Sequence, residues 1–170
     1  MKAIHYLALM LVALIGLTAC SDDDKDGHFF QLTYTGKNTV TVDHEYDPVV
    51  ITCKVTKNDD GTLDVEMPEY QLPNTKIGDL TIGAVTIKKI AYNEERGAYY
   101  RIFGKDRLKM DFKSEGGMVN INGNFDFTED SNIEVQLKDN GVLIVLDYTF
   151  PAMEPMHLRI NSKFDVDIVK

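Results

Sequence analysis

The chain has 170 residues, of which 44% are hydrophobic and 26% are charged, a composition typical of globular proteins that excludes a wholly disordered chain. A chain of this length forms one domain and buries enough apolar surface to fold without a disulfide or a metal. The formal net charge of -9 repels phosphate backbones, so we expect no nucleic-acid partner.

Residues 1–19 predict a signal peptide. Lys2 is followed by an apolar stretch from Tyr6 to Ala19, which is shorter than the roughly 20 residues that a membrane-spanning helix needs. The letters LTAC, which end at Cys20, resemble the lipobox of bacterial lipoproteins. The resemblance implies cleavage before Cys20 and lipidation of its sulfur, which makes the membrane a partner. An ordinary secretory signal that ends near a cysteine is the alternative.

Residues 20–29 predict a tether between this cysteine and a folded domain over residues 30–170. This segment contains a run of acidic residues, which cannot pack against a core, so we expect the segment to stay solvated. It resembles the export signal of Bacteroidota lipoproteins, which implies display on the outer face of the outer membrane. A tether that faces the periplasm is the alternative. The residues that carry this resemblance directly follow the cysteine: Ser21, Asp22, Asp23 and Asp24.

From residue 30 onward, apolar and polar residues alternate, which predicts strands with one buried face. In VVITCKVTK (49–57), Cys53 has the buried phase, and we expect it to pack in the core rather than to act as a nucleophile. TLDVEM (62–67) repeats the alternation. The loop KNDDGT between them predicts an antiparallel hairpin.

Two features predict breaks in later strands. Pro68 and Pro73 lack backbone donors, which places the stretch between them at a sheet edge or a strand break. In GDLTIGAVTI (78–87), the buried phase changes across Gly83-Ala84. This change predicts a bulge or a sharp bend, such as a strand makes at a barrel corner.

Alternation continues through RLKMDF (107–112) and MVNINGNFDF (118–127), which predict two strands with a turn at 115–117. Asn140-Gly141 is the pair that a type I′ turn favours, and it predicts a hairpin. With about nine or ten short strands and no long helix, we expect an all-β fold. The expected architecture is an antiparallel meander closed into a barrel of about 8–10 strands, with a β-sandwich as the alternative.

The segments YTGKNTVTV, DGTLDVEMPEYQL, IGDLTIGAVTI and VNINGNF, in this order, resemble the calycin-like β-barrel lipoproteins of gut Bacteroidota. The resemblance covers residues 31–165 and implies a lipocalin-like barrel. The chain has no tryptophan, so it lacks the Gly-x-Trp signature of true lipocalins.

No catalytic motif stands out. The sequence has no nucleophile elbow and no metal-binding histidine or cysteine spacing, so we expect neither an enzyme nor a cofactor or metal. The acidic loops at 59–61 and 129–131 lack the twelve-residue pattern of an EF-hand.

Tyrosines are the candidate ligand contacts, because a phenol offers both a flat apolar face and a hydrogen bond. We therefore expect a surface lipoprotein that binds a small apolar or glycan-like ligand in its barrel. The alternative is a structural module without a ligand that meets another envelope protein, for which the irregular segment 68–78 is the candidate contact. The candidate ligand contacts are Tyr70, Tyr99, Tyr100 and Tyr148.

Overall fold

The computed structural model describes residues 30–42, 44–117, 121–153 and 156–167 and, within these, the side chains outside 150–158. These residues form antiparallel strands, and among them no helix is long and apolar enough to cross a membrane. The predicted signal peptide and tether lie outside the described residues. The strands are β1 (Phe30–Thr41), β2 (Val49–Lys57), β3 (Leu63–Met67), β4 (Tyr70–Thr75), β5 (Gly78–Ile82), β6 (Val85–Asn93), β7 (Ala98–Ile102), β8 (Lys109–Gly116), β9 (Asn122–Asp126), β10 (Asn132–Lys138), β11 (Gly141–Met153) and β12 (Met156–Asp167).

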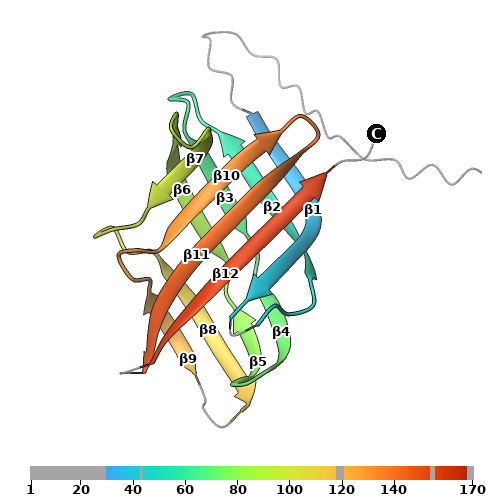
Figure 1. Cartoon of the computed structure of the whole chain (residues 1–170), viewed down its shortest axis with the longest axis vertical. Coiled ribbons are helices and arrows are strands. Elements are labelled where there is room, and N and C mark those ends of the chain that lie inside the picture. The colour runs from blue at the N-terminus through green and yellow to red at the C-terminus, as the bar shows by residue number, and fades with distance from the viewer. Residues whose placement is uncertain (1–29, 43, 118–120, 154–155, 168–170) are drawn as a thin grey trace, which may run out of the picture.

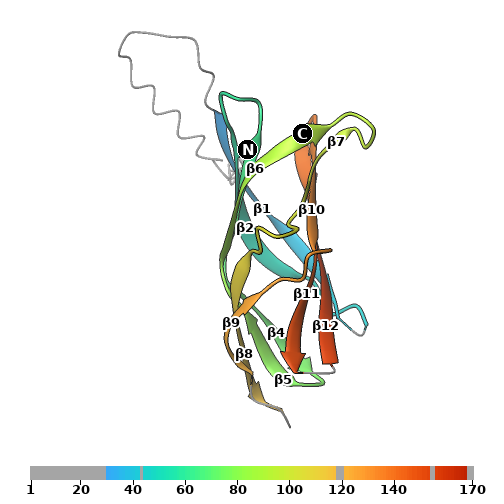
Figure 2. The same ribbon diagram turned by 90° about the vertical axis from the view of Figure 1, so that its left-hand side faces the viewer.

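Eight strands close into a barrel in the order β1-β2-β3-β6-β7-β10-β11-β12, with β12 paired back to β1 (Figure 1). The predicted all-β barrel is therefore confirmed. The remaining four strands form a second sheet in the order β4-β5-β8-β9. This sheet gathers at one end of the molecule, where it faces β11 and β12 (Figure 2). Of the two expected architectures, barrel and sandwich, the structure is therefore a barrel, and its wall continues at one end as a second sheet that faces β11 and β12.

The second sheet arises because two long hairpins leave the barrel partway along their length. One hairpin bends where β3 ends before Pro68 and where β5 passes into β6 at Gly83. The Gly83 backbone N–H donates to the carbonyl of Asp111 at 2.7 Å, and a Cβ at Gly83 would lie 2.9 Å from the Asp111 side chain. Glycine is therefore needed at this joint, and the predicted break at Gly83-Ala84 is confirmed.

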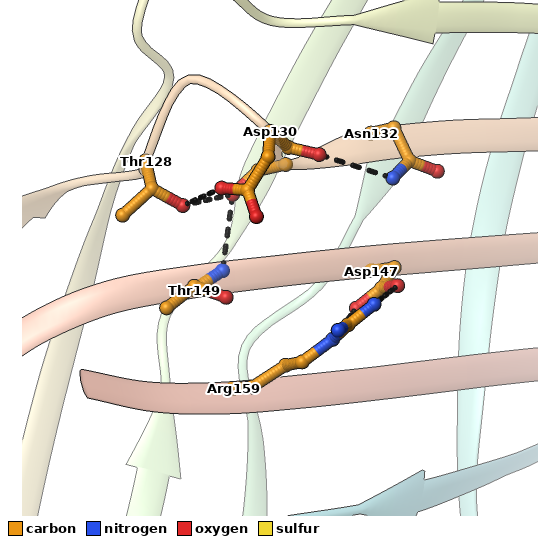
Figure 3. Close-up of polar contacts among 7 residues, drawn as sticks. Thr128, Asp130, Asn132, Asp147, Thr149 and Arg159 are labelled. Atoms are coloured by element: carbon orange, nitrogen blue, oxygen red, sulfur yellow. Dashed lines mark hydrogen bonds and ion pairs between the residues drawn. The ribbon is translucent and has the colours of Figure 1, made fainter.

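The second hairpin bends at the loop between β9 and β10, where Thr128, Asp130 and Asn132 lie beside Thr149 of β11 (Figure 3). The buried Ser131 hydroxyl accepts the backbone N–H of Thr149 at 3.0 Å, and Thr128 N–H donates to the Thr149 carbonyl at 2.8 Å, so both residues hold this loop against β11. Nearby, Arg159 of β12 makes an ion pair with Asp147 of β11. That pair is exposed on its arginine side, so it contributes little to stability.

The core follows the predicted alternation. Cys53 is fully buried between β1 and β3, and the inward residues of β11 are buried in turn at Val142, Ile144, Leu146 and Tyr148. At the junction with the second sheet, the ring of Phe127 stacks on that of Tyr148 with centroids 4.7 Å apart. Among the described residues, large buried side chains therefore fill the interior where the barrel meets the second sheet.

The hairpin predicted at Asn140-Gly141 is confirmed, but the prediction that its turn is of type I′ is wrong. Lys138 pairs with Gly141, so the turn residues are Asp139 and Asn140, and none of these residues has a positive φ. Gly141 is required for a different reason. A Cβ there would lie 1.8 Å from the carbonyl oxygen of Val166, because β11 passes very close to the backbone of β12.

We predict that Gly141→Ala lowers the free energy of unfolding by about 2 kcal/mol or more, because the new methyl group must push two paired backbones apart. Gly123→Ala is the matched control, since its Cβ would only touch the Phe125 ring at 3.4 Å. Urea unfolding followed by circular dichroism measures both. Equal stability of the two variants would contradict this role of Gly141.

Candidate functional site

The barrel end opposite the second sheet is its mouth. It is formed by the start of β1 and by the β2–β3, β6–β7 and β10–β11 turns (Figure 1). Three apolar side chains there remain exposed: Phe30 by 47%, Tyr92 by 55% and Leu137 by 43%. These side chains belong to the inward-facing rows of their strands, but they are exposed because the packed core ends before it reaches them. The mouth therefore presents apolar surface where a ligand would enter.

The strand register shows that Tyr92 faces the barrel axis. Tyr92 pairs with Tyr99, which pairs with the fully buried Val135, and paired residues project from the same face of a sheet. The rings of Tyr92 and Tyr99 meet edge to face with centroids 5.2 Å apart. These two tyrosines form one wall of the mouth.

A bulge in β6 brings Tyr92 to this face. Lys89 has a positive φ of 55°, and its N–H donates to the Asp64 carboxylate at 2.8 Å instead of continuing the ladder. The extra residue shifts the alternation of the strand by one position, so that Ile90 and Tyr92 point into the barrel interior. The phase change at Gly83-Ala84 was predicted from the sequence, whereas this second one was not.

The opposite wall of the mouth carries a groove of about 340 Å³. The groove lies between the first half of β1 and the β10–β11 turn, and the described pairing of β1 with β12 runs from Lys37 to Thr41. Burial raises the pKa of the Tyr34 phenol at the inner end of this groove. The groove is lined by Phe30, Leu32, Tyr34, Leu137, Lys138, Asp139, Asn140 and Gly141.

The four predicted ligand tyrosines do not meet in one cup. Tyr99 lies at the mouth, whereas Tyr100 pairs with Glu134 on the outer wall and has the Arg96 guanidinium 3.9 Å from its ring centroid. Tyr70 and Tyr148 are buried near the second sheet. Of the four, only Tyr99 therefore lies at the mouth.

Tyr70 and Tyr148 instead belong to a buried polar quartet with Asn38 and Ser162. The Tyr70 hydroxyl donates to Ser162 Oγ at 3.5 Å, and Ser162 Oγ donates to Asn38 Oδ1 at 2.8 Å. Burial raises the pKa of Tyr70, and it raises the pKa of Tyr148 well above its ordinary value, with the nearby Tyr70 phenol adding to the effect. Both phenols are therefore neutral over the physiological pH range.

The outer face of the second sheet carries a larger, polar groove of about 480 Å³. There, Asn124 donates to the Asp111 carboxylate at 2.8 Å. The single aromatic residue in its lining, Phe112, is buried, so the groove offers a sugar no exposed ring for stacking. An apolar ligand at the mouth fits the described side chains better than a glycan in this groove.

Sequence reasoning identified Tyr99 but missed Phe30 and Leu137 at the mouth, and it missed half of the polar quartet, although a signal was present. In FQLTYTGKNTV, the inward phase that begins at Phe30 places Asn38 inside the barrel. Likewise, Ser162 interrupts an apolar alternation between Ile160 and Phe164. A polar residue at an inward position of a strand is the signal that would have identified them.

Among the described residues, no group of three or more histidines, cysteines or carboxylates is placed to hold a metal ion. Cys53 is a free, buried thiol whose pKa burial raises to about 12. A thiol needs a lowered pKa to react as a nucleophile, so the surroundings of Cys53 suit packing rather than chemistry.

A closed barrel that exposes apolar side chains at its mouth defines a class of small β-barrels suited to binding. The family model of the calycin-like beta-barrel domain matches residues 30–152, and the chain therefore belongs to that family. No curated protein and no solved structure matches it. Membership of a family whose barrels typically bind small hydrophobic molecules supports a general binding role.

We predict that the protein loses stability as pH rises above about 9. Because the pKa of Cys53 is raised from 9.0 to about 12, the unfolded chain releases this proton first, so the stabilisation is complete below pH 9 and is lost as pH approaches 12. Between pH 7.5 and 10.5, Cys53 accounts for about 2 kcal/mol of the lost free energy of unfolding.

Urea unfolding of the wild type and of Cys53→Ala at both pH values measures this effect. The buried phenols of Tyr70 and Tyr148 are common to both proteins, so the wild type should lose about 2 kcal/mol more than the variant. Equal losses in the two proteins would show that the thiol is not protected.

Proposed function

We propose that the protein is a surface-exposed outer-membrane lipoprotein that binds a small hydrophobic ligand at its barrel mouth and catalyses no reaction. One observation carries the binding role: the inward rows of apolar side chains continue beyond the packed core at Phe30, Tyr92 and Leu137, where solvent reaches them. Covering such side chains with a ligand removes apolar surface from water, which is the main driving force of small-molecule binding.

The first described strand, β1, begins at the mouth with Phe30, so the proposed tether joins the barrel at this end. The proposed tether of residues 20–29 spans at most about 35 Å when fully extended. A ligand with a membrane-partitioning apolar part would therefore reach the mouth over a short distance. This geometry favours hydrophobic molecules over glycans as the ligand.

The alternative role, contact with another envelope protein, gains support from the filled barrel interior, which leaves binding to the surface. The segment 68–78 that was expected to make this contact is poorly suited to strand pairing. There β4 is an edge strand, but it contains Pro73, a register shift after Leu72 and a positive φ of 59° at Asn74. Such features protect a sheet edge from pairing with another chain.

We predict that Leu137→Asn and Phe30→Asn each weaken the binding of 11-(dansylamino)undecanoate, a fluorescent fatty acid, about fivefold. Each side chain is about half exposed, and covering the remaining apolar surface contributes about 1 kcal/mol. Fluorescence titration measures the dissociation constants. Val50→Asn is the control, because Val50 is 66% exposed but lies on the outer wall of β2, and its affinity should match that of the wild type.

Loss of affinity in Val50→Asn to the same degree would indicate nonspecific adsorption to exposed apolar side chains. Absence of any saturable binding by the wild type would reject the mouth as a site for apolar ligands and leave the interaction module as the better account.

We predict that cells fed labelled palmitate incorporate the label into the wild type and not into Cys20→Ser, and that this variant leaves the membrane fraction. Replacing Asp22, Asp23 and Asp24 by alanine should keep the label but protect the protein from protease added to intact cells. The control replaces the exposed acidic pair Glu94 and Glu95 by alanine and should change neither result. An unlabelled wild type would refute the anchor.

A further inference from the structure

The polar quartet lies inside the barrel where the second sheet joins it. Its members come from four strands: Asn38 from β1, Tyr70 from β4, Tyr148 from β11 and Ser162 from β12. All four are buried, Asn38 and Ser162 completely. Beside them, the ring of Phe127 covers that of Tyr148. The quartet is therefore a small polar island in apolar surroundings.

The hydrogen bonds within the quartet leave two polar atoms without a partner. Tyr70 donates to Ser162 and Ser162 donates to Asn38 Oδ1, but neither Asn38 Nδ2 nor the Tyr148 hydroxyl has a partner with hydrogen-bond geometry among the described residues. The Tyr70 hydroxyl lies near enough to that of Tyr148 to influence its pKa, but not in the position of a hydrogen-bond partner. Reversing the Asn38 amide would exchange its oxygen and nitrogen and would still leave one atom of the amide without a partner. The same site thus lacks partners for both an amide and a phenol.

Two such atoms are costly, since a buried polar group that loses water without gaining a partner is strongly unfavourable. Native proteins satisfy nearly all buried polar groups, often through an internal water. The partner that is missing here must be able to accept hydrogen bonds. It must also be uncharged, because the groups that influence the pKa values of Tyr70 and Tyr148 are phenols, a hydroxyl, an amide and the neutral thiol of Cys53, and none of them is a cation.

We propose that the polar quartet binds one neutral oxygen inside the barrel, which accepts hydrogen bonds from Tyr148 and from Asn38. The oxygen belongs to a water molecule, because the described side chains between the mouth and the quartet, such as Tyr34 and Ile144, are buried in the packed core and leave a ligand at the mouth no way to reach it. A carboxylate is excluded from the site because no positive charge among these neighbours would offset its burial.

Removing the Tyr148 hydroxyl tests the proposal, because the melting temperature should fall if the hydroxyl has a partner and rise if it has none. If the hydroxyl donates to a bound oxygen, Tyr148→Phe breaks a hydrogen bond and lowers the melting temperature by roughly 2–5 °C. If the hydroxyl has no partner, the same substitution removes a buried unsatisfied group and raises the melting temperature. Tyr92→Phe removes an exposed phenol hydroxyl and is the control, with an expected shift of less than about 1 °C.

A crystal structure of the wild type provides the second measurement, and it does not depend on the folding of a variant. The proposal requires density for an oxygen within about 3.2 Å of both Tyr148 Oη and Asn38 Nδ2. An increased or unchanged melting temperature of Tyr148→Phe would overturn it, and so would a direct bond in the crystal from Tyr148 Oη to Asn38 Nδ2 or to Tyr70 Oη.

Discussion

The constraint on which the structure depends is that two long hairpins must leave the barrel wall partway along their length. At one joint, Gly83 donates to the Asp111 carbonyl at 2.7 Å and leaves no space for a side chain. At the other, the Ser131 hydroxyl holds the returning chain against β11 through Thr149. Because both hairpins bend together, their outer halves pair as a second sheet that covers one end of the barrel.

This asymmetry separates two environments along the barrel axis. Near the second sheet, stacked aromatic rings such as Phe127 and Tyr148 enclose polar groups away from bulk water. At the mouth, the same inward rows continue past the last packed layer and expose Phe30 and Leu137. Apolar surface is thus available to a ligand at one end, while hydrogen-bonding capacity lies deep in the other. The two environments differ because packed side chains fill one end while the core stops short of the other, and not because the strands differ in composition.

The polar quartet illustrates why barrel interiors tolerate few polar residues. Asn38 and Ser162 satisfy each other at 2.8 Å, but the four groups together contain more donors than their mutual geometry can use. In a low-dielectric interior, such an excess either destabilises the fold or is matched by a bound oxygen. The retention of four polar side chains from four strands in one place is the reason to regard the quartet as a site.

The sequence by itself determined the all-β class, the inward phase of Cys53 and of the alternating core, the hairpins, and the break at Gly83-Ala84, because these depend on local periodicity and turn chemistry. Tertiary structure alone decided that Tyr99 lies at the mouth, that Tyr70 and Tyr148 are enclosed, and that Gly141 serves a close backbone approach. These outcomes depend on which strands pair and in which register. A bulge such as that at Lys89 shifts the register by one residue and reverses every face that follows.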